Sequence, residues 1–122
     1  MPVALIFYDN LLIGSQLVNR LQDLGYRVQL VSDLETLARL AQEVKPMVFL
    51  TNLTARTSPV LDAIRVLRAN TVTAHIPVLV FTKEGEKQLP HLARAAGATL
   101  VTSEAGSVAQ LPQLLERALE VE

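Results

Sequence analysis

Residues 45–52 read KPMVFLTN, a short apolar run that follows a lysine–proline stop and ends in two polar residues. Nearly continuous Val, Leu and Phe over so few positions is typical of a strand buried on both faces, as in a parallel sheet covered by helices. Comparable runs occur near the start of the chain and at residues 78–82. In all, we expect five strands, at residues 3–8, 27–31, 47–51, 78–82 and 98–102.

The segments between these runs carry apolar residues at helical spacing. After the first run, Ile13, Leu17, Leu21 and Leu24 share one helical face. Gly25 follows where a left-handed helix cap would lie, because glycine adopts that conformation without steric cost. The first helix is therefore predicted to end near residue 24.

Two further helices are predicted from capping boxes, in which a serine and the residue three positions later satisfy each other's backbone N–H groups. Ser32 and Glu35 have this spacing at the start of the second helix, which Lys45 and Pro46 would end. Ser107 has the same spacing to Gln110 at the start of the fifth.

Proline positions indicate where the third and fourth helices begin. Ser58 followed by Pro59 is typical of an N-cap and the first helical residue. A proline inside a helix removes a hydrogen bond and clashes with the preceding turn, so the fourth helix should be short and begin near Leu89 or Pro90.

Alternating strands and helices joined by right-handed crossovers predict an α/β fold, a (βα)5 doubly wound parallel sheet with helices on both faces. The 122 residues fall within the usual size of one compact domain, and no linker-like stretch divides them. We therefore expect a single domain over residues 1–122.

Composition argues against several functional classes. Eleven basic and twelve acidic residues give a formal net charge of -1 with no basic block, so we expect no nucleic-acid partner. There is no cysteine, and two isolated histidines, His75 and His91, give no metal-ligand pattern, so we expect no transition-metal site. The apolar N-terminal run is short and broken by Asp9, so we expect no membrane association and a cytoplasmic location.

Ligand sites in open parallel sheets lie beyond the carboxyl ends of the strands. Polar side chains follow four of the predicted strands there, and the candidates for a site are Tyr8, Asp9, Asn52, Thr82, Lys83 and Glu104. No glycine-rich phosphate-binding turn follows the first strand, because Gly14 stands alone.

Five segments in order, LIFYDN, LGYRV, KPMVFLTN, IPVLVFT and RAAGA, resemble the receiver domain of bacterial response regulators over nearly the full length of the chain. The resemblance implies the flavodoxin-like strand order 2-1-3-4-5. It also implies a site with an acidic pair after strand one, a phosphoacceptor aspartate after strand three, a hydroxyl residue after strand four and a lysine after strand five.

The chain departs from that family pattern at three of these positions. Tyr8 replaces the first acidic residue, Asn52 falls at the phosphoacceptor position, and a gapless count from RAAGA places Glu104 at the lysine position. Asp9 and Thr82 match the family. Because an amide is neither a good nucleophile nor an anionic ligand for magnesium, we expect no phosphorylation at Asn52 and no Mg²⁺ at Asp9.

A purely structural interpretation competes with a functional one at each of the remaining polar residues of the site. Asp9 is as well explained as a solvated carboxylate or helix cap, and Thr82 as an ordinary strand end. Lys83 would replace the missing positive charge or simply be an exposed loop lysine. For Asn52 we favour a hydrogen bond to Asp9 and nearby backbone over contact with a ligand.

The favoured hypothesis is a degenerate receiver, or pseudo-receiver, without catalytic residues, cofactor or enzymatic activity, which acts in signal transduction by binding a protein partner or itself as a homodimer. The face of helix four, strand five and helix five commonly serves this purpose in the family, and here it would comprise His91, Arg94, Thr99, Gln113, Glu116, Arg117 and Glu120. Two alternatives stay open: a conventional receiver phosphorylated at a nonstandard site, and a small-molecule-binding flavodoxin-like domain.

Overall fold

A computed structural model of the chain describes residues 2–53 and 57–119. The elements in chain order are β1 (Val3–Phe7), α1 (Leu11–Asp23), β2 (Arg27–Leu30), the 3-10 turn η1 (Leu34–Thr36), α2 (Leu37–Val44), β3 (Val48–Asn52), α3 (Thr57–Ala69), β4 (Val78–Thr82), α4 (Gln88–Ala96), β5 (Leu100–Ser103) and α5 (Ser107–Leu119). All five predicted strands are present, with ends that differ from the prediction by up to two residues.

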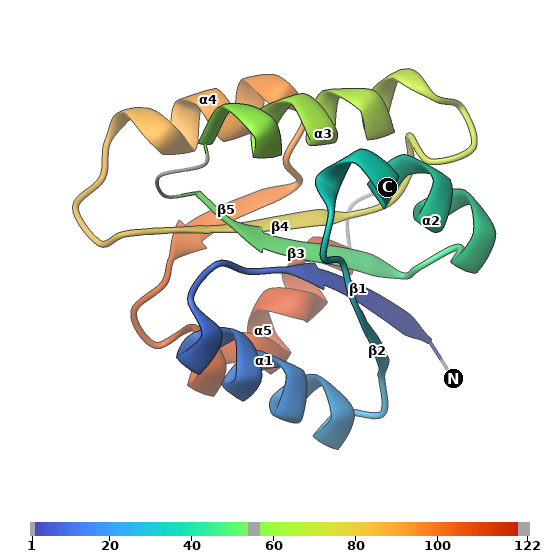
Figure 1. Cartoon of the computed structure of the whole chain (residues 1–122). Coiled ribbons are helices and arrows are strands. Elements are labelled where there is room, and N and C mark those ends of the chain that lie inside the picture. Colours follow the sequence, from blue (N-terminus) through green and yellow to red (C-terminus); the bar gives the residue numbers. More distant parts are fainter. Residues whose placement is uncertain (1, 54–56, 120–122) are drawn as a thin grey trace.

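The strands form one parallel sheet in the order β2-β1-β3-β4-β5, which confirms the expected fold class and strand order. Helices α1 and α5 cover one face, and α2, α3 and α4 cover the other (Figure 1). The order reverses between β1 and β3, so the polar residues that follow these strands lie side by side at one edge of the sheet.

Each face of the sheet has its own apolar core. Leu17 and Leu21 of α1 pack with Leu111 of α5 against one face, and Ile64 and Leu67 of α3 pack against the other. Every residue of β3 and β4 is buried, as their apolar runs predicted, and the burial includes the polar residues at their ends, Thr51, Asn52 and Thr82. Among the residues that the structure describes, no helix is both long enough and apolar enough to span a membrane.

The end of α1 follows the prediction. Gly25 has a positive φ of 91°, and the N–H of Tyr26 donates to the carbonyl of Leu21 while that of Gly25 donates to Gln22. This pair of bonds is the Schellman arrangement that closes a helix with glycine in the left-handed region.

Both predicted capping boxes are wrong. At η1 the carboxylate of Asp33, not the hydroxyl of Ser32, accepts the backbone N–H of Glu35 at 2.9 Å. At α5 the helix begins at Ser107 itself, and Gln110 N–H donates to the carbonyl of Gly106. The Ser107 hydroxyl is buried and has no hydrogen-bond partner in the described residues.

Helices three and four begin slightly earlier than predicted. Helix α3 starts at Thr57, before Ser58, and α4 starts at Gln88, so Pro90 lies in its first turn, where a missing N–H costs little. Helix α4 has 9 residues, as expected for a short helix. Lys45 ends α2 with a positive φ of 49°, in agreement with the predicted stop.

Candidate functional site

The carboxyl ends of β1, β3, β4 and β5 surround a cavity of about 380 Å³ at one edge of the sheet. Its lining comprises Asp9, Asn10, Asn52, Leu53, Phe81, Thr82, Lys83 and Glu104. Five of the six residues selected from the sequence therefore line one cavity. The sixth, Tyr8, reaches the same place through its hydroxyl group.

Asp9 and Asn52 are joined directly across β1 and β3. The side-chain amide of Asn52 donates to Oδ1 of Asp9 at 2.7 Å, and the backbone N–H of Asp9 lies 3.4 Å from Oδ1 of Asn52. Asn52 is buried, so the pairing satisfies polar groups that would otherwise be costly to remove from water. The expected hydrogen bond between Asn52 and Asp9 is confirmed.

Asp9 is not the cap of α1. That role belongs to Asn10, whose side-chain oxygen accepts the backbone N–H groups of Leu12 and Ile13 at 3.1 and 3.3 Å. Capping by Asn10 fixes where α1 begins and hence how the chain presents Tyr8 and Asp9, the two residues that follow β1.

Tyr8 and Glu104 form the second pair. The Tyr8 hydroxyl donates to Oε2 of Glu104 at 2.8 Å, and the Tyr8 ring lies tilted against Phe81 with centroids 6.1 Å apart. Burial raises the pKa of Tyr8 above its usual value of 10.0, and the hydrogen bond and negative charge of Glu104, then the charge of Asp9, raise it further. The phenol is therefore neutral and acts as the donor throughout the physiological range.

Backbone contacts hold Glu104 in place for this bond. Its N–H donates to the carbonyl of Thr82 at 2.7 Å, which ties the chain after β5 to the end of β4. Thr82 is buried, and Lys83 is exposed at the rim of the cavity.

Two carboxylates at this edge, those of Asp9 and Glu104, are the groups that could offer oxygen ligands to a magnesium ion. Mg²⁺ requires oxygen ligands in near-ideal octahedral geometry, usually including one or two carboxylates. Here one carboxylate, that of Asp9, accepts the Asn52 amide, and the other, that of Glu104, accepts the Tyr8 hydroxyl. Within residues 2–53 and 57–119, no three His, Asp or Glu side chains converge into a metal-binding group.

Most residues of the predicted interaction face are exposed, on α4 and α5. These are His91, Arg94, Gln113, Glu116 and Arg117, whereas Glu120 lies outside the described residues. Thr99 differs, because its hydroxyl accepts from Arg68 at 3.1 Å and from the backbone of Val78 at 3.0 Å. His75 is also exposed, in the connection before β4, so both histidines lie on the surface as expected.

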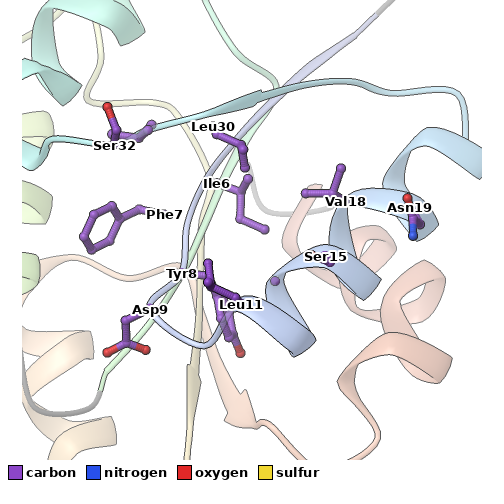
Figure 2. Close-up of a pocket in the computed structure, with 12 residues that line it drawn as sticks. Ile6, Phe7, Tyr8, Asp9, Leu11, Ser15, Val18, Asn19, Leu30 and Ser32 are labelled. Carbon is purple, nitrogen blue, oxygen red and sulfur yellow. The ribbon is translucent and has the colours of Figure 1, made fainter.

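A larger hollow, which was not predicted, adjoins the site between α1 and the outer strand β2. It has a volume of about 660 Å³, and Figure 2 shows Leu11 and Val18 of α1 on one side and Leu30 of β2 on the other, above Ile6. Leu11 is 81% exposed and Leu30 68%. The sequence signal was present, because Leu11 lies off the helical stripe that packs into the core and lines the hollow instead.

Comparisons place the fold among known structures. No protein-family model matches the chain, and no curated protein matches it. Among solved structures, the receiver domain of a sensor histidine kinase from Pseudomonas aeruginosa has a TM-score of 0.84 at 22% identity, with 98% of each chain covered. The chain has a receiver fold. That neighbour has a magnesium ion coordinated in its active-site cleft.

Two other solved structures have the same fold over most of their length. A chemotaxis protein of Vibrio cholerae has a TM-score of 0.82 at 22% identity, covering 98% of this chain and 99% of that one. A response regulator protein from Burkholderia multivorans is 28% identical, with a TM-score of 0.69 and coverage of 93% and 94%. The receiver fold thus extends over essentially the whole chain.

Proposed function

We propose that this chain is a phosphorylation-independent pseudo-receiver, a signalling module that acts by binding a protein partner rather than by catalysis. The observation that carries the proposal is the 2.7 Å bond between the Asn52 amide and Asp9. In the receiver pattern the position of Asn52 holds the aspartate nucleophile, and here it holds a neutral amide that is already engaged.

Electrostatics at the second pair support the same proposal. A phosphoryl group carries negative charge that the usual lysine after strand five would offset. In its place Glu104 presents a carboxylate to the cavity, and that carboxylate is tied to Tyr8 at 2.8 Å. Metal-independent behaviour is part of the same proposal, because Asn52 replaces a carboxylate with a neutral amide and so removes one anionic ligand for magnesium.

The direct test is exposure of the protein to a small phosphodonor with Mg²⁺, followed by intact-mass measurement. We expect no added phosphate under conditions in which a conventional receiver is labelled as the positive control. A mass increase of one phosphate, with the labelled residue then located by peptide mapping, would instead establish the alternative of phosphorylation at a nonstandard site.

For the binding surface we propose the exposed face of α4 and α5. It carries both signs of charge, with Arg94 on α4 and with Glu116 and Arg117 on α5, and mixed charge favours a partner with a complementary arrangement. Arg94→Glu should weaken binding of the native partner, whereas Arg39→Glu, an exposed charge on α2, should not. Equal binding by both variants would remove this face from the proposal.

A second candidate function is binding of a small molecule in the hollow between α1 and β2. Its volume of about 660 Å³ lies within the range of ligand pockets, and its walls are mostly apolar with Ser15, Asn19 and Ser32 at the rim. A thermal-shift screen of nucleotides, flavins and apolar metabolites would support it if a hit loses its effect in a Val18→Asp variant.

A further inference from the structure

The outer strand β2 has an edge that is open to another strand. It is the end strand of the sheet, and its residues are exposed or half-buried along its whole length, whereas the other end strand, β5, is half-buried or buried throughout (Figure 1). Edge strands in monomeric proteins are usually protected by proline, bulges, charged side chains or very short length. Strand β2 is short, but its sequence RVQL has no proline, and its one charged residue, Arg27, stands at its start.

The pairing with β1 fixes which backbone groups of β2 face outward. Arg27 N–H donates to Pro2 and Val31 N–H donates to Ile6, so odd-numbered residues of this strand turn their backbone groups inward to β1. In a strand the backbone groups of alternate residues point to opposite sides. Val28 and Leu30 therefore direct their N–H and C=O groups to the open edge.

We propose that β2 pairs with β2 of a second copy of this chain, antiparallel about a twofold axis through Gln29, so that the two sheets become continuous. About that axis Val28 of each copy lies opposite Leu30 of the other, and each such pair exchanges two backbone hydrogen bonds. Both outward-facing residues are then satisfied. The axis also sets Gln29 opposite its own copy.

Side chains on the α1 face of the combined sheet suit this register. Val28 packs against the core on that face, and the register places Leu30 of the second copy beside it, which covers part of the exposed leucine at the rim of the hollow. Because the interface is isologous, this apolar contact occurs twice.

Local geometry limits the alternatives. The chain bends at Ser32, and the N–H of Tyr26 is already bonded to Leu21 within its helix cap. An axis through Gln29 uses the straight part of the strand between these two points. A short pairing of this kind is small by the standards of stable interfaces, so we expect a dimer that dissociates on dilution.

A cysteine crosslink tests the axis directly, since the chain has no cysteine of its own. Antiparallel residues that face each other without backbone bonds have Cα atoms about 4.5 Å apart, within the range for a disulfide. Gln29→Cys should therefore form a disulfide dimer readily under mild oxidation. Arg27→Cys is the matched control, because residue 27 and its copy are offset by roughly 13 Å along the strands.

Light scattering after size exclusion provides the second measurement, on the full chain without crosslinking. Val28→Pro should abolish dimerisation by removing an outward N–H while the inward ladder to β1 remains. Leu30→Lys is a milder edge variant if the proline variant does not fold. Arg94→Glu should leave the dimer unchanged, which separates this interface from the proposed α4 and α5 surface.

A monomer at every concentration, equal crosslinking of the two cysteine variants, or a dimer that Arg94→Glu disrupts would each overturn the proposal. The phosphodonor test above does not bear on it, so the two proposals fail independently.

Discussion

The Tyr8 hydroxyl donates a 2.8 Å hydrogen bond to Glu104, 96 positions away along the chain. In the receiver pattern an acceptor carboxylate follows strand one and a donor lysine follows strand five. Here the order is inverted, with the donor after β1 and the acceptor after β5. The substitutions of tyrosine and glutamate at these two family positions thus complement each other. Together with the pair of Asn52 and Asp9, they form hydrogen bonds within the protein at the cavity.

Removal of the Tyr8 hydroxyl should measure what this bond contributes. Tyr8→Phe keeps the ring contact with Phe81 but loses the bond to a charged acceptor, and we expect a loss of about 1 to 2 kcal/mol in the free energy of unfolding by urea. Tyr26→Phe is the control, because the Tyr26 hydroxyl makes no hydrogen bond to described residues. Equal losses in both variants would show that the bond contributes nothing of its own.

Alkaline pH should weaken the fold through the same residue. The pKa of Tyr8 is raised in the folded state, so above about pH 10, where an unfolded tyrosine ionises, the unfolded state loses a proton that the folded state retains. Stability is therefore fully present below pH 10 and falls as the pH rises beyond it. The decline should be shallower in Tyr8→Phe than in the parent chain when unfolding is measured over this range.

The sequence predicted the strands and their order because that information is local and repeated. The apolar runs at residues 48–50 and 78–81 are typical of strands that are buried on both faces of a covered parallel sheet. The bond between Asn52 and Asp9 was also predictable, since adjacent strands in the expected order end beside each other. Both inferences require only the position of a residue along its strand, and neither requires the direction of a side chain.

Other features depend on side-chain direction, which the sequence does not determine. Tyr8 and Glu104 could each be placed at the site, but whether they face each other depends on the bond from Glu104 to Thr82 and on the packing of the Tyr8 ring. The two capping-box predictions were wrong for a similar reason. At η1 the carboxylate of Asp33 made the bond that the spacing assigned to Ser32.

Conversion of Asn52 to aspartate should destabilise the protein without restoring phosphorylation. In Asn52→Asp a carboxylate oxygen replaces the amide 2.7 Å from Asp9, so at neutral pH we expect a loss of about 1 to 3 kcal/mol. Two adjacent carboxylates raise the pKa of one of them, and the loss should diminish as the pH falls and that group binds a proton. Phosphate incorporation in this single variant would contradict the proposed function, because Tyr8 and Glu104 remain.

Asn70→Asp is the matched control for that substitution. Its side-chain oxygen accepts the backbone N–H of Val72 at 2.9 Å, and an aspartate retains this acceptor. Its stability at neutral pH should change little, so a comparable loss in both variants would argue against repulsion at Asp9.

Gly97 and Arg68 provide a prediction outside the site. The Arg68 guanidinium donates to the carbonyls of Gly97, Ala74 and Ile76 at 2.7 to 2.9 Å, which ties α3 to the connections before β4 and β5. Gly97 has a φ of 120°, and a Cβ there would lie 2.5 Å from Cγ of Arg68. Gly97→Ala should therefore combine backbone strain with overpacking and cost about 2 to 4 kcal/mol in urea unfolding.

Two further variants separate backbone strain from steric overlap in the cost of Gly97→Ala. Gly85 also has a positive φ, of 87°, but nothing lies within 4 Å of an added Cβ, so Gly85→Ala should cost only about 1 to 2 kcal/mol of strain. In the double variant Gly97→Ala/Arg68→Ala the clash is removed, and the loss should be smaller than the sum of the two single losses. Strict additivity would mean that the two side chains do not collide and that only the conformation of residue 97 matters.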